Sequence, residues 1–187
     1  MKKLLLIIVC AFLGIQLASA QYFSKGDFVL NAGIGFGNTL HTGSGMKTTV
    51  PPISASLEYC IIDNLFDENS SIGIGGVVGY SAQKYKYDFD LSGGKYEVKN
   101  SDFLLGTRGS FHYQFVDKLD TYASIVLAYD IVSASSSDNS SRHSADAGSF
   151  FSGVYVGARY YFTQNFAAMA EMGYDIAVFK IGVAVKF

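Results

Sequence analysis

The chain has 187 residues, a formal net charge of −2 and 49% hydrophobic residues. This charge balance argues against nucleic-acid binding, which needs a basic patch, so we expect no nucleic acid partner. No segment beyond the first 20 residues reaches 18 unbroken apolar residues, which excludes a transmembrane helix there.

The N-terminus has the three parts of a secretion signal. Lys2 and Lys3 precede an apolar run over residues 4–17, and Ala18-Ser19-Ala20 provides small residues for cleavage. A transmembrane anchor is the alternative, but the run is shorter than the ~20 residues that a helical span needs. We therefore expect residues 1–20 to be a signal peptide that is removed after Ala20.

Removal of the signal leaves residues 21–187, enough for a single domain. This mature part holds 12 basic and 16 acidic residues, and Cys60 is its only cysteine. No intramolecular disulfide is then possible, although an exported protein meets an oxidising environment. We expect Cys60 to be a small buried residue on the inner face of a strand.

Residues beyond the signal alternate between apolar and small or polar along eight segments, which predicts eight β-strands because successive side chains in a strand point to opposite faces. In the first, Phe28, Leu30 and Ile34 share one face while Asn31 and glycines occupy the other. The predicted strands cover residues 27–38, 53–62, 71–83, 96–115, 121–132, 150–162, 166–174 and 179–187.

The connections between these strands alternate between long and short. Residues 39–52 form a predicted loop that ends in two prolines, which cannot donate to a sheet, and residues 133–149 form a Ser-rich loop. Residues 116–120 and 163–165 are predicted short turns. The alternation continues past the third strand over residues 84–90, so we expect this hairpin to project beyond the part of the sheet that would cross a membrane. Long outer loops and short periplasmic turns are typical of outer-membrane barrels.

A sheet that crosses a bilayer must close, because lipid cannot satisfy backbone groups at a free edge. The sequence therefore predicts an all-β fold, an eight-stranded antiparallel up-and-down transmembrane β-barrel in which the last strand pairs with the first. Aromatic residues gather near the predicted strand ends, as interfacial girdles do, and plain strand propensity is the alternative reason for them.

Three stretches near the C-terminus resemble a known family. Residues 157–166 (Gly-Ala-Arg-Tyr-Tyr-Phe-Thr-Gln-Asn-Phe), residues 170–174 (Ala-Glu-Met-Gly-Tyr) and the alternating end at Phe187 are similar to small OmpA/OmpX-like outer-membrane barrels. The resemblance implies location in the outer membrane of a Gram-negative cell, with outer-membrane lipids as partners, and no reaction or cofactor. It also implies insertion by the outer-membrane assembly machinery, which recognises a terminal strand signal, here Phe179, Ile181, Val183, Val185 and Phe187.

Charged residues occupy inward positions of the predicted strands: Glu58, Arg108, Asp130, Arg159, Glu171 and Lys180. Charges inside a membrane barrel are costly unless they are paired or hydrated. We expect Arg159 and Glu171 to be diagonal neighbours and Glu171 to meet Lys180 across the last hairpin. A salt-bridge plug is the preferred interpretation, and an ion pathway gated by this cluster is the alternative.

Ser110 and His112 share one face of a strand and form the one arrangement that suggests catalysis, as in an outer-membrane lipid A deacylase. Their inward position argues against this, since an enzyme acting on lipid needs a site that faces lipid. His41 and His143 stand alone in polar loops without the spacing of metal ligands. We therefore expect no enzyme, no cofactor and no metal.

The sequence leaves three functions open. The preferred one is a monomeric, non-enzymatic outer-membrane barrel with a structural or surface-interaction role through its extracellular loops. The first alternative is a narrow channel for ions or small solutes, and the remote one is a lipid-modifying enzyme.

Overall fold

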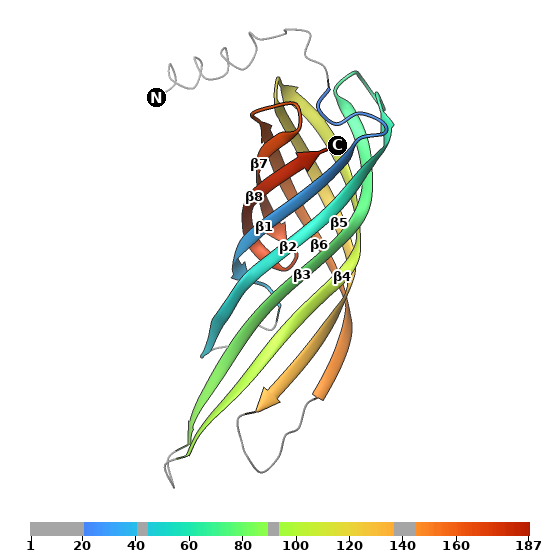
Figure 1. Cartoon of the computed structure of the whole chain (residues 1–187). Helices are drawn as coiled ribbons and strands as arrows, with labels where there is room; N and C mark the ends of the chain where they lie inside the picture. The colour runs from blue at the N-terminus through green and yellow to red at the C-terminus, as the bar shows by residue number, and fades with distance from the viewer. Residues whose placement is uncertain (1–20, 41–44, 90–93, 137–144) are drawn as a thin grey trace, which may run out of the picture.

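The computed structural model describes residues 21–40, 45–89, 94–136 and 145–187. They form one closed antiparallel barrel in which each strand pairs with the next and β8 pairs with β1 (Figure 1). The strands are β1 Phe28–Asn38, β2 Met46–Asp63, β3 Ser70–Phe89, β4 Gly94–Val116, β5 Leu119–Ser136, β6 Ala145–Tyr161, β7 Phe166–Tyr174 and β8 Ala177–Lys186. The predicted fold class is thus confirmed, while the predicted signal peptide lies outside the described residues.

The first and last strands close the barrel as predicted. Ala32 lies opposite Val183 in this pairing. The amide of Phe28 donates to the carbonyl of Phe187 and the amide of Phe187 donates back to Phe28, both at 3.0 Å. Neither strand therefore leaves an unpaired edge along this seam, as a bilayer requires. In the described residues, no helix is long and apolar enough to cross a membrane.

The side chains alternate between the two faces of the wall as the pattern predicts. On β5, Val126 is fully buried in the lumen, whereas its neighbours Ile125 and Leu127 are about 60% exposed on the outside. Outward residues of the other strands are similarly exposed and apolar. An apolar surface of this extent is unstable in water but suits the interior of a bilayer.

β2, β5 and β6 extend into the two segments that the sequence predicts to be long loops, which corrects both long-loop predictions. β2 begins at Met46 and includes Pro51 and Pro52. The prolines are tolerated because the pairing of β2 with β1 ends at Ile34–Ile53, so no hydrogen bond to β1 is lost where the prolines lack an amide proton. The predicted Ser-rich loop is shorter, since β5 continues to Ser136 and β6 begins at Ala145. Pairing with neighbouring strands outweighs the low strand propensity of this segment.

The barrel is much taller on one side than on the other. β3 and β4 stay paired out to Phe89 and Gly94, whereas β7 and β8 have only 9 and 10 residues. Figure 1 shows the ends of β3 to β6 reaching far past the short strands. We call these ends, with residues 46–52 of β2, the projecting wall, and we call its side the outer end of the barrel. The inner end carries the short turns.

Candidate functional site

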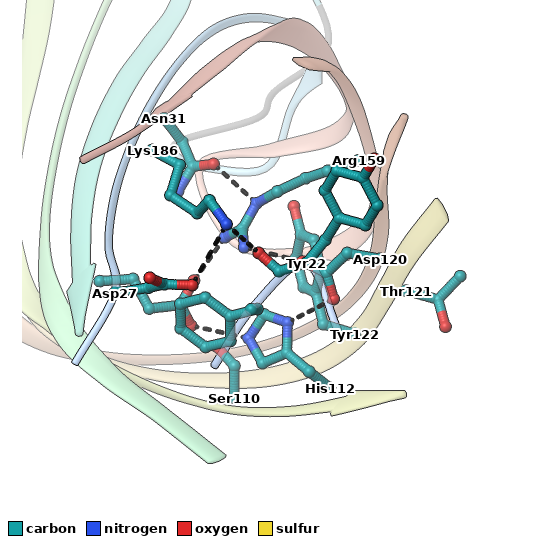
Figure 2. Close-up of polar contacts among 12 residues, drawn as sticks. Tyr22, Asp27, Asn31, Ser110, His112, Asp120, Thr121, Tyr122, Arg159 and Lys186 are labelled. Atoms are coloured by element: carbon teal, nitrogen blue, oxygen red, sulfur yellow. Dashed lines mark hydrogen bonds and ion pairs between the residues drawn. The ribbon is translucent and has the colours of Figure 1, made fainter. Parts of the chain in front are cut away.

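Charged side chains gather in the inner half of the lumen. They form an interior charge cluster of Glu58, Arg108, His112, Asp120, Arg159, Glu171, Asp175 and Lys180, all buried. Six strands and the β7–β8 connection contribute them, so the cluster ties together most of the barrel wall. Figure 2 shows part of the cluster, with Arg159 between Asn31 and Asp120 and with His112 beside Asp120.

Glu58 contacts three cations, more than any other carboxylate of the cluster. Arg159 donates to its Oε2, His112 Nε2 lies 3.1 Å from its Oε1, and Arg108 Nη2 lies 3.6 Å from its Oε2. Asp120 contacts two of the same cations. Its Oδ1 lies 2.8 Å from His112 Nδ1, and its Oδ2 lies 3.0 Å from Arg159 Nη1. Desolvated charges need such complete pairing, because an unpaired one would cost several kcal/mol.

Both ring nitrogens of His112 therefore face carboxylate oxygens. An ionised carboxylate only accepts hydrogen bonds, so the doubly protonated ring is the form that satisfies both contacts. With this imidazolium, the cluster holds four cations and four carboxylates and is neutral as a whole.

A second set of contacts lies towards the outer end of the cluster. Lys180 Nζ lies 2.7 Å from Glu171 Oε2 and also contacts Asp175. The Tyr122 hydroxyl donates to Glu171 at 2.7 Å, and Arg108 Nη1 reaches the same carboxylate at 3.7 Å. Arg108 thus joins this set to Glu58, and the cluster is one continuous network.

Aromatic rings cover the cations on their remaining sides. The Arg159 guanidinium lies 4.5 Å from the centre of the Tyr122 ring, and Lys180 Nζ lies 4.4 Å from that of Tyr155. Gly157 makes room for Tyr122, because a Cβ there would stand 2.5 Å from the ring. These contacts are cation–π interactions, and the rings also keep water from the charges.

The structure brings together five of the six charged residues predicted from sequence. Glu171 meets Lys180 across the last hairpin, as expected. Arg159, which is diagonal to Glu171 in register, turns instead to Glu58 and Asp120. Asp130 is buried apart from this cluster, opposite Leu104 of β4 and Ser149 of β6.

Three members of the cluster, His112, Asp120 and Asp175, are not among the charged residues that the sequence predicts to meet in the lumen. The sequence predicts Asp120 in a turn over residues 116–120, but β5 begins at Leu119 and turns the Asp120 carboxylate inward. The sequence also predicts Asp175 in a turn, whereas its carboxylate reaches into the lumen and contacts Lys180. Tyr122 and Ser124 point inward at alternate positions of β5, and the same alternation continued two residues towards the N-terminus predicts an inward side chain at Asp120.

The segment before β1 closes the inner end of the lumen. We call residues 21–27 the N-terminal strap. Phe23 is 1% exposed, and its ring centre lies 4.3 Å from that of His112. Lys186 Nζ holds the strap by bonds to the Tyr22 carbonyl at 3.0 Å and to Asp27 at 3.3 Å (Figure 2). Phe23 thus covers the charge cluster from the inner end.

Apolar side chains close the lumen on the other side of the cluster. This apolar layer consists of Leu40, Val77, Leu104, Val126, Ala128, Ile176 and Ala177. Leu40 and Ile176 come from the connections that follow β1 and β7, and the Thr39 amide donates to the Ile176 carbonyl at 3.4 Å. Both faces of the charge cluster are therefore covered by segments that reach in from outside the strands.

Ser110 and His112 do not form a nucleophile–base pair. Ser110 Oγ lies 2.8 Å from Ser124 Oγ and 3.3 Å from Arg108 Nε, while His112 engages Glu58 and Asp120. Both residues are buried in the lumen, away from lipid. Among the described residues, no group of His, Cys, Asp and Glu side chains is arranged to hold a metal. His41 and His143 lie outside the described residues.

Solved structures with the same fold are outer-membrane barrels. Ail of Yersinia pestis, in complex with the heparin analogue sucrose octasulfate, aligns with a TM-score of 0.51 at 9% identity over 87% of this chain and 99% of its own. A major outer membrane protein of Thermus thermophilus aligns with a TM-score of 0.50 at 14% identity over 87% and 99%. OprG of Pseudomonas aeruginosa gives 0.49 at 14% identity over 89% and 99%.

No family model matches the chain, and no curated protein matches it. The structural matches are too low in identity to transfer a function, but they do establish the architecture. The chain has the fold of small eight-stranded outer-membrane barrels. This confirms, at the level of fold, the OmpA/OmpX-like resemblance seen in its last strands.

Proposed function

We propose that the chain is a non-enzymatic outer-membrane barrel that binds an extended segment of an extracellular partner at the projecting wall. The apolar exterior, the predicted signal peptide and the terminal strand with its final Phe187 support export and insertion into the outer membrane. Insertion would use the assembly machinery, which would recognise the terminal strand.

The filled lumen argues against the channel alternative. A path through the barrel would have to pass Phe23, the interior charge cluster and then the apolar layer around Leu104 and Ile176. An eight-stranded barrel has just enough interior for its side chains. A pathway would require both covering segments to move, whereas the projecting wall is already exposed.

One observation carries the interaction role: the outer part of β6 is paired on one side only. Residues 145–153 pair with β5, but the pairing with β7 begins at Val154–Tyr174. Pairing on a free edge is a general way to bind an extended peptide. The other lateral edge of the wall is blocked, because it carries Pro51 and Pro52, which lack amide protons.

Side chains beside the free edge suit such a peptide. Phe150 is 92% exposed, and its ring packs edge-on against Tyr129 at 5.4 Å. A bound strand would place alternate side chains against these rings while its backbone bonds to β6. We infer that the partner supplies an extended segment with an apolar residue at this position.

A phage-displayed peptide library panned against the barrel in nanodiscs tests the proposal. Ser149 and Ser152 are three residues apart in a strand without a bulge, so one amide faces β5 and the other faces the free edge. Amide hydrogen exchange in the wild-type barrel identifies the amide that faces the free edge, because it should exchange faster than the amide that pairs with β5. We expect Ser149→Pro and Ser152→Pro to differ, with peptide enrichment lost in the variant whose proline replaces the edge-facing amide.

Gel mobility before and after boiling verifies that both variants are folded barrels. No enrichment with the wild-type barrel would overturn the proposal, and so would equal enrichment with both proline variants. The Phe150→Ala variant keeps the backbone edge and should retain binding with weakened side-chain selectivity.

A further inference from the structure

A polar pocket of about 330 Å³ opens at the inner end of the barrel. Four separate segments line it, namely the N-terminal strap, the β4–β5 turn, the β6–β7 turn and the end of β8. The lining residues are Gln21, Tyr22, Asp117, Gln164, Asn165 and Lys186. We call this cavity the inner-end pocket. It lies at the opposite end of the barrel from the free edge of β6, so it goes beyond the proposed peptide interaction there.

Hydrogen bonds hold the walls of the inner-end pocket in place. The side-chain amide of Asn165 donates to the Lys186 carbonyl at 2.8 Å, and the Lys186 amide donates to the Asn165 carbonyl at 2.8 Å. The Tyr161 amide donates to the Lys118 carbonyl at 2.8 Å, which fixes the β4–β5 turn against β6. The pocket is therefore preformed, and a ligand would not have to order these segments in order to bind.

Polar side chains around the pocket keep hydrogen-bonding capacity for a ligand. Within the described ranges, the side chains of Gln21, Asp117 and Gln164 form no hydrogen bond or ion pair with another residue. Lys186 uses two of the three donors of its ammonium group in bonds to the N-terminal strap, which leaves one. A carboxamide both donates and accepts, as a peptide bond does. The pocket thus offers a carboxylate, an ammonium donor and two carboxamides.

The charges around the pocket disfavour ligands of a single sign. Asp117 and Asp27 would repel an anion such as phosphate, and Lys186 would repel a cation. A neutral sugar would gain nothing from either charge. Cleavage after Ala20 would add the α-ammonium group of Gln21, so that the surroundings would hold two charges of each sign. A ligand with an ammonium group and a carboxylate can form charge-assisted hydrogen bonds to both signs.

The places of the two charges on the barrel set the length of such a ligand. Asp117 precedes β5 and Lys186 ends β8, with β6 and β7 between them. At ~4.8 Å between neighbouring strands, the two residues lie roughly 14 Å apart along the wall, and their side chains span part of this distance. A free amino acid holds both charges within one residue, whereas each further residue adds up to ~3.6 Å. The pocket volume, at the lower end of the roughly 300–1,000 Å³ of ligand sites, limits the ligand to a few residues.

We propose that the inner-end pocket binds a short zwitterionic peptide. Its ammonium group lies at Asp117, its carboxylate lies at Lys186, and its peptide bond pairs with the carboxamide of Gln164. A free periplasmic peptide and a cell-wall peptide that contains a diamino acid both offer these groups, so the experiment compares the two sources.

NMR titration of the barrel in nanodiscs with the dipeptide alanylalanine tests the proposal. Binding should shift the side-chain amide signals of Gln164. Asp117→Asn should weaken binding roughly tenfold, because it keeps the shape of the side chain and removes the charge from a charge-assisted hydrogen bond. Glu68→Gln is the matched control, since it removes one negative charge from an exposed turn at the same end and should leave binding unchanged.

Blocked peptides identify which end of the ligand meets which residue. N-acetylalanylalanine lacks the ammonium group, so it should bind roughly tenfold more weakly than alanylalanine and equally well to the wild type and to Asp117→Asn. Alanylalanine amide lacks the carboxylate and should still respond to Asp117→Asn. A soluble cell-wall tetrapeptide with a diamino acid provides the last comparison. Tighter binding of this tetrapeptide than of alanylalanine would support the cell wall as the source, and weaker binding would support free peptides.

Three results would overturn the proposal. They are the absence of any shift at Gln164 with all of these peptides, an equal loss of binding in Asp117→Asn and Glu68→Gln, and equal binding of the acetylated and the free dipeptide. Retained mobility shift on boiling ensures that each variant is folded. The free edge of β6 is intact in all of them, so the outcome is independent of the proposed peptide interaction at the projecting wall.

Discussion

The two halves of the lumen are filled differently. In the inner half, Glu58 and Arg159 belong to a network in which every charge meets an opposite charge. In the outer half, an apolar layer that includes Leu104 lies next to the buried Asp102 and Asp130. The same narrow barrel therefore tolerates either filling, provided that charges are paired and apolar groups leave no cavity.

The two halves are also closed by different segments. Phe23 of the N-terminal strap covers the charges, whereas Leu40 and Ile176 belong to connections between strands. In both halves the wall alone does not complete the core. We expect the two halves to respond differently to substitution. Removing one member of the charged network leaves its partners as unpaired buried charges, whereas truncating a side chain of the apolar layer leaves only a cavity.

The largest effect is expected for Glu58→Ala in the charged half. It would leave Arg159 and Arg108 without a shared carboxylate and should lower the unfolding free energy by about 3–5 kcal/mol. Urea titration in bilayers, followed by gel mobility, measures this change. Glu68→Ala in an exposed turn is the control and should stay within about 0.5 kcal/mol. A decrease in unfolding free energy as small as that of the control would show that the network does not stabilise the barrel.

Phe23→Ala tests the closure of the charged half. Removing this buried ring should cost about 3–5 kcal/mol and open the inner end to water. Cys60 reports the opening, because its Sγ lies buried against the Phe23 carbonyl. Alkylation of Cys60 in the folded barrel should be slow in the wild type and fast in the variant. The control is Phe66→Ala in an exposed turn, which should leave the alkylation rate of Cys60 unchanged. Equally slow alkylation of Cys60 in the Phe23→Ala and Phe66→Ala variants would contradict the role of the strap.

Leu104→Ala tests the apolar half and should cost about 2–5 kcal/mol through a cavity alone. Leu105→Ala is the matched control, because its side chain faces outward and lipid can fill the space. The same urea titration compares the two. Equal losses at both positions would mean that the apolar layer is not packed as described.

The smallest effect is expected at the exposed turn outside both halves. The Tyr113 hydroxyl donates to Asp67 at 2.8 Å and holds the pKa of that carboxyl below its ordinary value. The bond therefore stabilises the fold above the ordinary aspartate pKa of ~4, and this contribution is lost as the pH falls through the lowered pKa. Tyr113→Phe should lower the urea midpoint at pH 7 but match the wild type at pH 2. A constant difference at every pH would show that packing, not the hydrogen bond, is responsible.

Strand ends were harder to predict than strand centres. The predicted loop over residues 39–52 was cut short by β2, whose prolines sit where β1 no longer pairs. Propensity describes one residue at a time, whereas a strand end depends on whether a neighbouring strand continues beside it. The projecting wall, and with it the free β6 edge, follows from these pairings.

By itself the sequence determined which face each strand residue takes, the number of strands and the closure of the barrel. The physical reason is that strand alternation has a fixed period of two and that a bilayer forbids an open edge. Only the tertiary structure decided which charges meet. Arg159 reaches Glu58 and Asp120 across the lumen because contacts between distant strands depend on side-chain length and on the tilt of the wall, which no local pattern encodes. The burial of Phe23 likewise depends on a lumen that exists only once all eight strands have closed.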